Sequence, residues 1–245
     1  MEKISVILIA KDEEKNIESV LKSVDWADEI VIVDAGSEDK TVDIAKKYTG
    51  KIFFKEWEGF VQQKRYALGL ANNEWVLSID ADERVSPGLK EEIKRIQPDD
   101  FDGFFIRRKN CFFQKEITTC GWDKDYQLRL FKKSKTNLKE KQVHEGFNVN
   151  GKVGRLENVI IHYTFSSLHN YLKKINEYTT LQAKEMYKTR NKVTVFTILG
   201  HTFSAFFRYY VSLKGFKDGM YGLIISFFNS VSTLLTYVKI WEMKK

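Results

Sequence analysis

The first hundred residues alternate short apolar runs with segments in which apolar side chains recur every three or four positions. The apolar runs have the length of strands and cover residues 4–10, 29–34, 51–54 and 75–80. The segments with helical spacing cover residues 17–24, 42–48 and 60–71. Ser86 and Pro87 have the residue types of a helix N-cap and first turn, so a further helix is expected there. This alternation predicts an α/β fold with a mostly parallel central sheet and helices on both faces.

From residue 103 onward the pattern changes to short strands and loops, followed by helices. The strand-like runs cover residues 103–108, 127–131, 143–150 and 159–165. Residues 167–190 are charged and amphipathic, as expected for a surface helix. Residues 193–207 and 219–238 then carry no formal charge.

Both uncharged segments divide into an apolar stripe and a stripe of small or polar residues. In the second segment the apolar stripe consists of Met220, Ile224, Phe227, Val231, Leu234 and Val238. Residues 219–238 are long enough to span a bilayer, but the two stripes favour an amphipathic helix. The two helices, joined by the basic turn 214–219, predict a hairpin in the cytoplasmic membrane interface. The alternative is packing on the globular domain or on a second subunit in a homodimer.

The net charge of +7 is unevenly distributed between the two halves of the chain. Residues 1–100 hold 15 Lys and Arg against 22 Asp and Glu, whereas residues 101–245 hold 25 against 11. The basic second half favours anionic partners such as phospholipid headgroups or phosphorylated glycans. No nucleic-acid partner is expected, because no recognised binding module is visible. Cys111 and Cys120 fit reduced thiols in the core of a cytoplasmic protein, and no zinc-type spacing is present.

Two aspartates, Asp80 and Asp82, follow the fourth apolar run. Residues two apart in an extended segment point to the same side, so both carboxylates could address one ligand. In parallel sheets ligands bind beyond the carboxyl ends of the strands, where Asp34 is also expected. The loop after the first strand lacks the glycines of the common phosphate-binding motifs. A divalent cation, Mg²⁺ or Mn²⁺, held by carboxylates could bind a diphosphate instead.

Several segments in order resemble the family 2 glycosyltransferases, which use nucleotide sugars and have the Rossmann-like GT-A fold. These segments are SVILIAKDEEKNI, IVIVDAGSEDKT, QKRYAL and VLSIDADE. The resemblance is closest to the lipopolysaccharide core beta-1,4-glucosyltransferases (WaaE/KdtX-like), which GWDKDYQLRLF, VHEGF and RYYVSLKGFKDGMYG also resemble. It implies a glycosyltransferase domain over residues 1–190, with a nucleotide-sugar half (1–100) and an acceptor half (101–190). Residues 191–245 would form the helical hairpin.

The resemblance also implies roles for individual residues in binding the donor. Asp34 would accept a hydrogen bond from the base, most simply uracil, and Asp80 would meet the ribose or the metal. Lys64 lies where many members have an arginine that faces the nucleotide, although a lysine lacks the bidentate fork. The edge of the nucleotide pocket would be formed by Ala10, Asp12, Glu13 and Glu14. Trp122 could stack on a sugar face, or it could simply belong to the core.

The metal and the catalytic base are assigned in the same way. Asp82 would ligate the metal, and His162 could complete its coordination, with His144 a weaker candidate. A packed core histidine is the alternative for His162. Asp125 matches the position of the general base of inverting members. Its rivals are Asp123 and Glu145, and its structural alternative is a surface ion pair with Arg129.

Taken together, the resemblance implies an inverting, metal-dependent glycosyltransferase. It would move a hexose, with glucose favoured, from a UDP-sugar to a lipid-linked glycan such as lipopolysaccharide core at the inner face of the cytoplasmic membrane. The alternative acceptors are a polyprenyl phosphate or a polyprenyl-linked surface polysaccharide. A nucleotidylyltransferase would need a glycine-rich, arginine-bearing loop after the first strand, which is absent. A non-catalytic scaffold with this fold is a further alternative.

Overall fold

The structure is a computed structural model that describes residues 2–97, 100–138, 146–165, 168–187 and 193–245. The chain forms two compact units. The first unit consists of Met1–Arg108 and Tyr126–His162, and the second consists of Lys109–Asp125 and Tyr163–Lys245. Strands β6 (Gly103–Phe112) and β11 (Val153–Phe165) begin in the first unit and end in the second. The division predicted at residue 190 stays a prediction.

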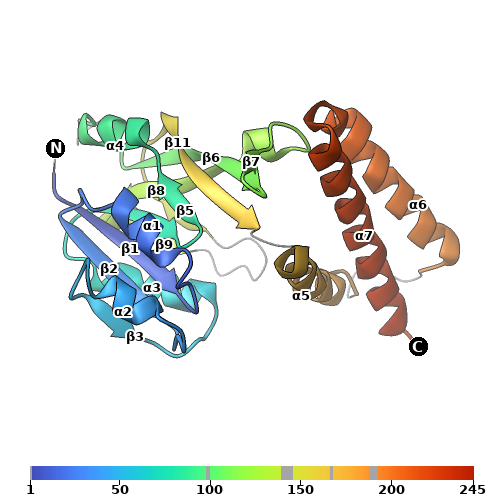
Figure 1. Ribbon diagram of the computed structural model, residues 1–245, viewed down its shortest axis with the longest axis horizontal. Helices are drawn as coiled ribbons and strands as arrows, with labels where there is room; N and C mark the ends of the chain where they lie inside the picture. The colour runs from blue at the N-terminus through green and yellow to red at the C-terminus, as the bar shows by residue number, and fades with distance from the viewer. Residues whose placement is uncertain (1, 98–99, 139–145, 166–167, 188–192) are drawn as a thin grey trace. The chain divides into compact units, whose positions relative to one another are not determined.

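The first hundred residues form the strands and helices that their pattern predicts (Figure 1). The strands are β1 (Ile4–Ala10), β2 (Glu29–Asp34), β3 (Ile52–Phe54), β4 (Trp75–Asp80) and the short β5 (Glu83–Val85). The helices are α1 (Ile17–Ser23), α2 (Thr41–Ala45), α3 (Phe60–Leu70) and α4 (Pro87–Lys94). β1 pairs in parallel with both β2 and β4, and β3 pairs in parallel with β2. The predicted cap of α4 is confirmed, since the Ser86 hydroxyl accepts a hydrogen bond from the Leu89 amide at 3.2 Å.

The later strands extend the same sheet, but in antiparallel fashion. β8 (Tyr126–Lys132) lies antiparallel to β4 and to β6, and β11 lies antiparallel to β5. The strand order is β3-β2-β1-β4-β8-β6-β11-β5, with β7 (Lys115–Glu116) on β6. β9 (Thr136–Leu138) and β10 (Phe147–Val149) form a separate pair. The α/β fold class is confirmed, and β6 pairs antiparallel with β7 and β8, as expected where no crossover helix separates these strands.

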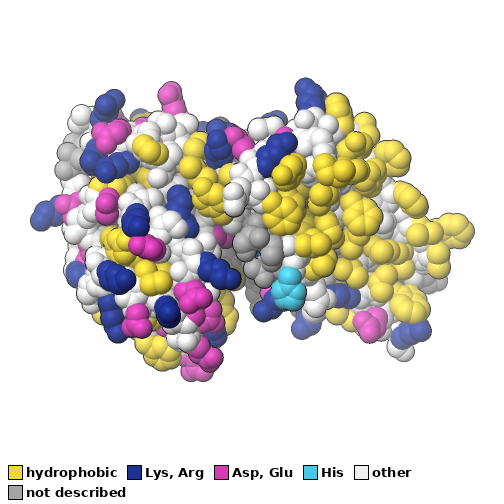
Figure 2. Space-filling view, in the orientation of Figure 1, with side chains coloured by type: hydrophobic (Ala, Val, Ile, Leu, Met, Phe, Trp, Pro, Cys, Tyr) yellow, Lys and Arg dark blue, Asp and Glu magenta, His cyan; other side chains and the backbone are white. Residues whose placement is uncertain are grey.

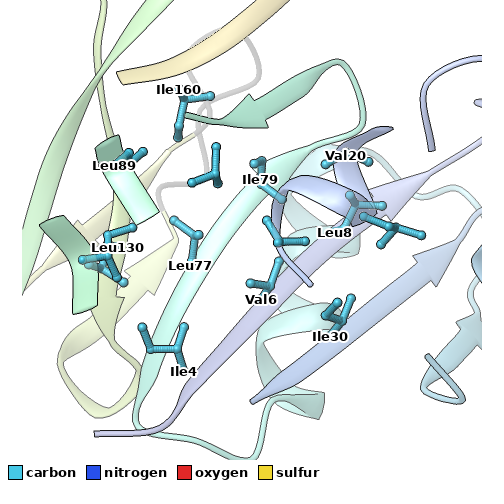
Figure 3. Packing of buried hydrophobic residues seen from close by; sticks show 14 of the residues in the cluster. Ile4, Val6, Leu8, Val20, Ile30, Leu77, Ile79, Leu89, Leu130 and Ile160 are labelled. Carbon is cyan, nitrogen blue, oxygen red and sulfur yellow. The ribbon is translucent and has the colours of Figure 1, made fainter. Parts of the chain in front are cut away.

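The core of the first unit lies on both faces of the sheet. Because side chains alternate along a strand, Val6 and Leu8 of β1 face α1 and α4, whereas Ile7 faces α3. Figure 3 shows the first of these layers, in which the β1 side chains lie beside Leu77 and Ile79 of β4. Two apolar layers hold the central strands firmly, so the loops at their carboxyl ends start from fixed positions.

The second unit is mainly helical. It contains the end of β6, β7, a short 3₁₀ helix at Trp122–Lys124, α5 (Leu168–Tyr187), α6 (Val195–Phe207) and α7 (Met220–Glu242). Between α6 and α7 lie a π-helical turn, η3 (Arg208–Ser212), and a 3₁₀ turn, η4 (Gly215–Asp218). α6 and α5 both pack against α7 (Figure 1). Cys111 and Cys120 are buried and free, as predicted, and burial raises the pKa of the Cys111 thiol.

Candidate active site

The loops that follow β1 and β2 are joined by hydrogen bonds. The Asp12 amide donates to the Ser37 hydroxyl at 2.9 Å, and the Asp12 carboxylate accepts from the Glu38 amide at 2.9 Å. The Glu14 amide donates to the Asp39 carboxylate at 3.0 Å. These predicted nucleotide-pocket residues therefore lie together, in a cross-linked pair of loops at the carboxyl ends of two adjacent strands.

Asp34 ends β2 and is buried. Its carboxylate accepts hydrogen bonds from the Gly36 amide at 2.9 Å and from the Ser37 amide at 3.0 Å. Gly36 has a φ of +84°, a conformation that other residues adopt only with strain. Ala10 ends β1 beside Asp34, and its carbonyl accepts from the Ala35 amide at 2.9 Å. Asp34 thus shapes the turn itself, and its contact with a base stays a prediction.

Asp80 ends β4 between two cations. Its Oδ1 lies 3.1 Å from Lys64 Nζ on α3, and its Oδ2 lies 2.6 Å from Arg129 Nη2 on β8. Lys64 therefore lies next to Asp80, and its contact with a nucleotide stays a prediction. Burial acts to raise the pKa of Asp80, but the two neighbouring cations outweigh it and hold that pKa well below its ordinary value. Asp80 is a carboxylate at neutral pH.

A second carboxyl, Glu83, shares the Arg129 guanidinium. Glu83 is fully buried, accepts from Arg129 Nη2 at 2.5 Å and accepts from the Asp80 amide at 3.0 Å. Arg108 Nη1 also lies 3.5 Å from Glu83. Burial, together with the negative charge of Asp80, raises the pKa of Glu83 in spite of the cations around it. Arg129, itself buried between two carboxyls, has its pKa raised and stays charged.

Asp82 and His162 form the other pair at this edge. His162 Nε2 lies 3.3 Å from Asp82 Oδ2, and the two side chains are 11% and 26% exposed. His162 is brought here by the pairing of β11 with β5, in which it lies opposite Glu83.

The Asp82 and His162 pair fits a shared divalent cation. Adjacent ligands of an octahedral Mg²⁺, with bonds of about 2.1 Å, lie about 3 Å apart, which is close to the observed spacing. Among the described residues no group of three or more His, Cys, Asp or Glu is placed to hold a metal. Two protein ligands suit Mg²⁺ or Mn²⁺, because such ions take their remaining ligands from substrate phosphates and water.

Two details of the sequence interpretation are wrong. Ala81 and Asp82 form a turn between β4 and β5, so Asp80 and Asp82 do not point to one side of an extended segment. They have different partners because the turn begins between them. Arg129 does not pair with Asp125 but points at Asp80 and Glu83, since it lies inside the buried strand β8.

Trp122, Asp123 and Asp125 belong to the second unit. Asp125 follows the short helix that holds Trp122 and Asp123, and its carboxylate accepts from Asn110 Nδ2 at 3.0 Å. Trp122 is half-buried and packs edge to face on Phe112, with ring centroids 6.3 Å apart. Its packing accords with the core alternative. His144 and Glu145 lie outside the described residues.

Sequence reasoning missed Glu83 and Arg129 as parts of the site. The available signal was an arginine flanked by Leu128 and Leu130 in an apolar strand. A charged side chain at such a position is buried only when it is paired, so its presence predicts a buried carboxyl partner. Nothing in the sequence of β8 identifies that partner as the residue that follows Asp82.

Comparison with known proteins gives consistent results. The profile of glycosyl transferase family 2 matches residues 5–164. An uncharacterized glycosyltransferase of Rickettsia typhi is 30% identical over 257 residues, covering 99% of this chain and 88% of the relative. The lipopolysaccharide core biosynthesis glycosyltransferase LpsC of Rhizobium meliloti is 26% identical, covering 98% of this chain and 92% of LpsC. The crystal structure of S. aureus TarS 1–349 in complex with UDP-GlcNAc has a TM-score of 0.51 at 17% identity, covering 95% of this chain and 81% of TarS.

Proposed function

Because the chain belongs to glycosyl transferase family 2, we propose that it transfers a hexose, most simply glucose, from a UDP-sugar to a lipid-linked glycan such as lipopolysaccharide core. The observation that carries this proposal is the family match over residues 5–164, which contains the loops at the ends of β1, β2 and β4. The relative LpsC acts in lipopolysaccharide core biosynthesis, which supports the class of acceptor. The GT-A fold itself is shown by the likeness to TarS.

The donor would bind at the edge that holds Asp80, Asp82 and Lys64. Asp82 and His162 would hold Mg²⁺ or Mn²⁺, which would neutralise charge on the departing diphosphate. The Lys64 ammonium could turn from Asp80 to the diphosphate, since it is a flexible point charge. That TarS was solved with UDP-GlcNAc is in keeping with a nucleotide-sugar donor.

The acceptor hydroxyl must lose its proton as it attacks the sugar, and Asp125 is the proposed base. Inversion of the anomeric centre follows if a single displacement occurs with this carboxylate on the side of the acceptor. The enzyme would work at the inner face of the cytoplasmic membrane, where a lipid-linked acceptor is presented. An Asp125→Asn variant should keep donor binding and lose transfer by at least about a hundredfold, the usual contribution of a general base.

A thermal-shift panel tests the donor site. UDP-glucose and other nucleotide sugars would be added with and without Mn²⁺ to the wild type, to Asp82→Asn and to the surface variant Asp43→Asn as a matched control. We expect a UDP-sugar to raise the melting temperature only with the metal, and Asp82→Asn alone to lose that rise, because a ligand that binds only the folded state stabilises it. If Asp82→Asn responds like the control, Asp82 is not a metal ligand.

The acceptor is tested by transfer from radiolabelled UDP-glucose to purified lipid fractions. Label in the lipopolysaccharide core fraction supports the proposal. Label that extracts with polyprenyl phosphate into organic solvent would move the acceptor to the polyprenyl class. Donor binding without transfer to any fraction would favour a non-catalytic scaffold.

A further inference from the structure

The second unit presents a large apolar surface on α6, η3 and α7. Seven of its side chains are more than half exposed, namely Val195, Phe196, Phe203, Phe207, Val211, Met220 and Phe227. Phe196 is 88% exposed, and no residue of α6 is buried. Figure 2 shows apolar side chains gathered over α6 and α7 with few charged side chains among them. We call these seven residues the apolar surface. Exposure of this kind to water is unfavourable, at about 1.5–3 kcal/mol for each large side chain, so a partner is expected to cover it.

α7 has small polar residues on its buried side and large apolar residues on its exposed side. Ser226, Ser230 and Thr236 are buried, whereas Met220 is 66% and Phe227 is 54% exposed. The polar stripe noted in the sequence is therefore the side that packs inward, together with Ile225 and other apolar residues. A helix on a water-soluble core usually has the opposite arrangement. Packing through small residues with apolar side chains outward is typical of helices in contact with lipid.

Close backbone contact explains why small residues are needed on the inner side. A Cβ added at Gly222 would lie 1.7 Å from the Gly215 carbonyl oxygen, so α7 meets η4 backbone to backbone. The Ser226 hydroxyl donates to the Gly222 carbonyl at 2.7 Å, and the Ser230 hydroxyl donates to the Phe227 carbonyl at 2.7 Å. These hydroxyls are satisfied within their own helix.

The connection between α6 and α7 carries exposed positive charges. Between residues 193 and 217 the chain has Arg208, Lys214 and Lys217, all exposed, and no acidic residue. The next residue, Asp218, is buried and accepts hydrogen bonds from the Thr118 amide and the Thr119 hydroxyl. This surface therefore suits an anionic partner. In a symmetric dimer the same patch would meet its own copy, with cations facing cations.

We propose that the apolar surface inserts into the headgroup region of an anionic phospholipid bilayer, with Arg208, Lys214 and Lys217 at the lipid phosphates. α7 is the one helix among the described residues that is long and apolar enough to cross a membrane, with a mean hydropathy of 1.5 over its most apolar window. It also packs on α5, which is rich in charged residues, so one side of α7 faces protein and the other side faces lipid. Such a helix lies in the interface. This surface would bring the enzyme to a lipid-linked acceptor, and only that consequence rests on the proposed function.

Vesicle co-sedimentation of the full chain tests the proposal. The probes are vesicles of phosphatidylcholine alone and of phosphatidylcholine with an equal part of phosphatidylglycerol. We expect at least about tenfold more protein on the anionic vesicles, since each basic residue near the surface adds about 1 kcal/mol. The variant Phe196→Ser/Phe203→Ser/Phe207→Ser should lose at least about tenfold in binding, and Lys214→Glu/Lys217→Glu should lose the preference for phosphatidylglycerol. Phe105→Ser, on an exposed phenylalanine of β6 in the first unit, is the matched control.

The outcomes separate this proposal from the donor site. The triple variant should keep the melting-temperature rise with UDP-glucose and Mn²⁺, which shows that it is folded. If it does not fold, the single variant Phe196→Ser, at the most exposed of these positions, replaces it. The proposal is wrong if the wild type stays in solution with both kinds of vesicle. It is also wrong if the wild type is a dimer and the triple variant is a monomer that still binds vesicles as well as the wild type does. If the wild type binds vesicles but its melting temperature does not respond to any nucleotide sugar, the proposed function is wrong and the proposed lipid-binding surface still stands.

Discussion

At the scale of single residues, the feature that sequence reasoning did not anticipate is the triad of Asp80, Arg129 and Glu83, in which Arg129 and Glu83 are buried. One guanidinium nitrogen serves both carboxyls, at 2.6 Å and 2.5 Å. Because Arg129 lies on β8 and the carboxyls lie at the turn after β4, the triad ties the candidate metal turn to the neighbouring strand. Removing one member of a buried ion pair leaves an uncompensated charge.

The Arg129→Met variant should therefore unfold about 3–5 kcal/mol more easily than the wild type in urea. The matched control is Lys46→Met, which breaks a surface pair with Asp43 and should change stability by less than about 1 kcal/mol. Adding Glu83→Gln to Arg129→Met should recover part of the loss, because the buried charge left behind is reduced. A single variant as stable as the control would show that the triad does not hold the turn.

At the scale of elements, the turn between β6 and β7 shows where local sequence is misleading. Phe113 and Gln114 have φ values of +47° and +69°, as in a type I′ hairpin turn. Such turns normally have Asn or Gly at these positions, so nothing in the sequence identifies this hairpin. Residues 103–108 of β6 were visible as a strand-like run, because burial on a sheet determines their residue types, whereas the two charged residues of β7 gave no such signal.

Gln114→Gly should stabilise the protein, because the left-handed conformation costs a residue with a Cβ about 1–2 kcal/mol. Part of this gain is offset by the larger freedom of glycine in the unfolded chain, which leaves an expected increase of about 0.5–1 kcal/mol in urea unfolding. Gln114→Ala keeps the Cβ and should show no gain. Equal effects of the two substitutions would mean that the turn is not strained at this position.

The same contrast holds for the candidate site. The positions of Asp34, Asp80 and Asp82 at strand ends followed from the alternation of strands and helices, because the carboxyl ends of parallel strands share one edge. The partners of these residues did not follow. His162 reaches Asp82 through the pairing of β11 with β5, which joins segments about 80 residues apart, and no local pattern encodes that pairing.

At the scale of the whole molecule, one end of the sheet carries the candidate site and the other end stabilises the fold. The carboxyl ends of β1, β2 and β4 carry the candidate site, whereas the amino ends are closed by Glu29, the first residue of β2. The Glu29 side chain is buried and accepts hydrogen bonds from the Ser5 hydroxyl, from Lys51 and from the Asn72 amide, the last at 2.8 Å. These contacts join β1 and β2 to the residues just before β3 and β4, at the end of the sheet opposite the candidate site.

Glu29 should make the fold sensitive to acid. Burial acts to raise its pKa, but the hydrogen bonds from Lys51, Ser5 and Asn72 outweigh burial and lower that pKa below its ordinary value. A carboxyl whose pKa is lower in the folded state contributes stability above its unfolded pKa, about 4.3, and loses it as the pH falls through the folded value. Asp80, whose pKa is also lowered, likewise stabilises the folded state less as the pH falls. Glu83 has the opposite effect: because its pKa is raised, it favours the folded state at low pH, and this contribution is lost as the pH rises.

We therefore expect the free energy of unfolding to fall as the pH drops below about 4, where Glu29 and Asp80 lose their contributions. Glu29→Gln should lower stability at pH 7 by about 1–3 kcal/mol, since it removes a charged acceptor from buried donors, and its loss of stability below pH 4 should be shallower. Urea unfolding at several pH values measures both effects, with Asp25→Asn, an exposed position, as the control. If Glu29→Gln keeps the full acid dependence of the wild type, other carboxyls govern it. Since Glu29 lies at the end of the sheet opposite the candidate site, binding of UDP-sugar and metal at pH 7 should be unchanged in this variant.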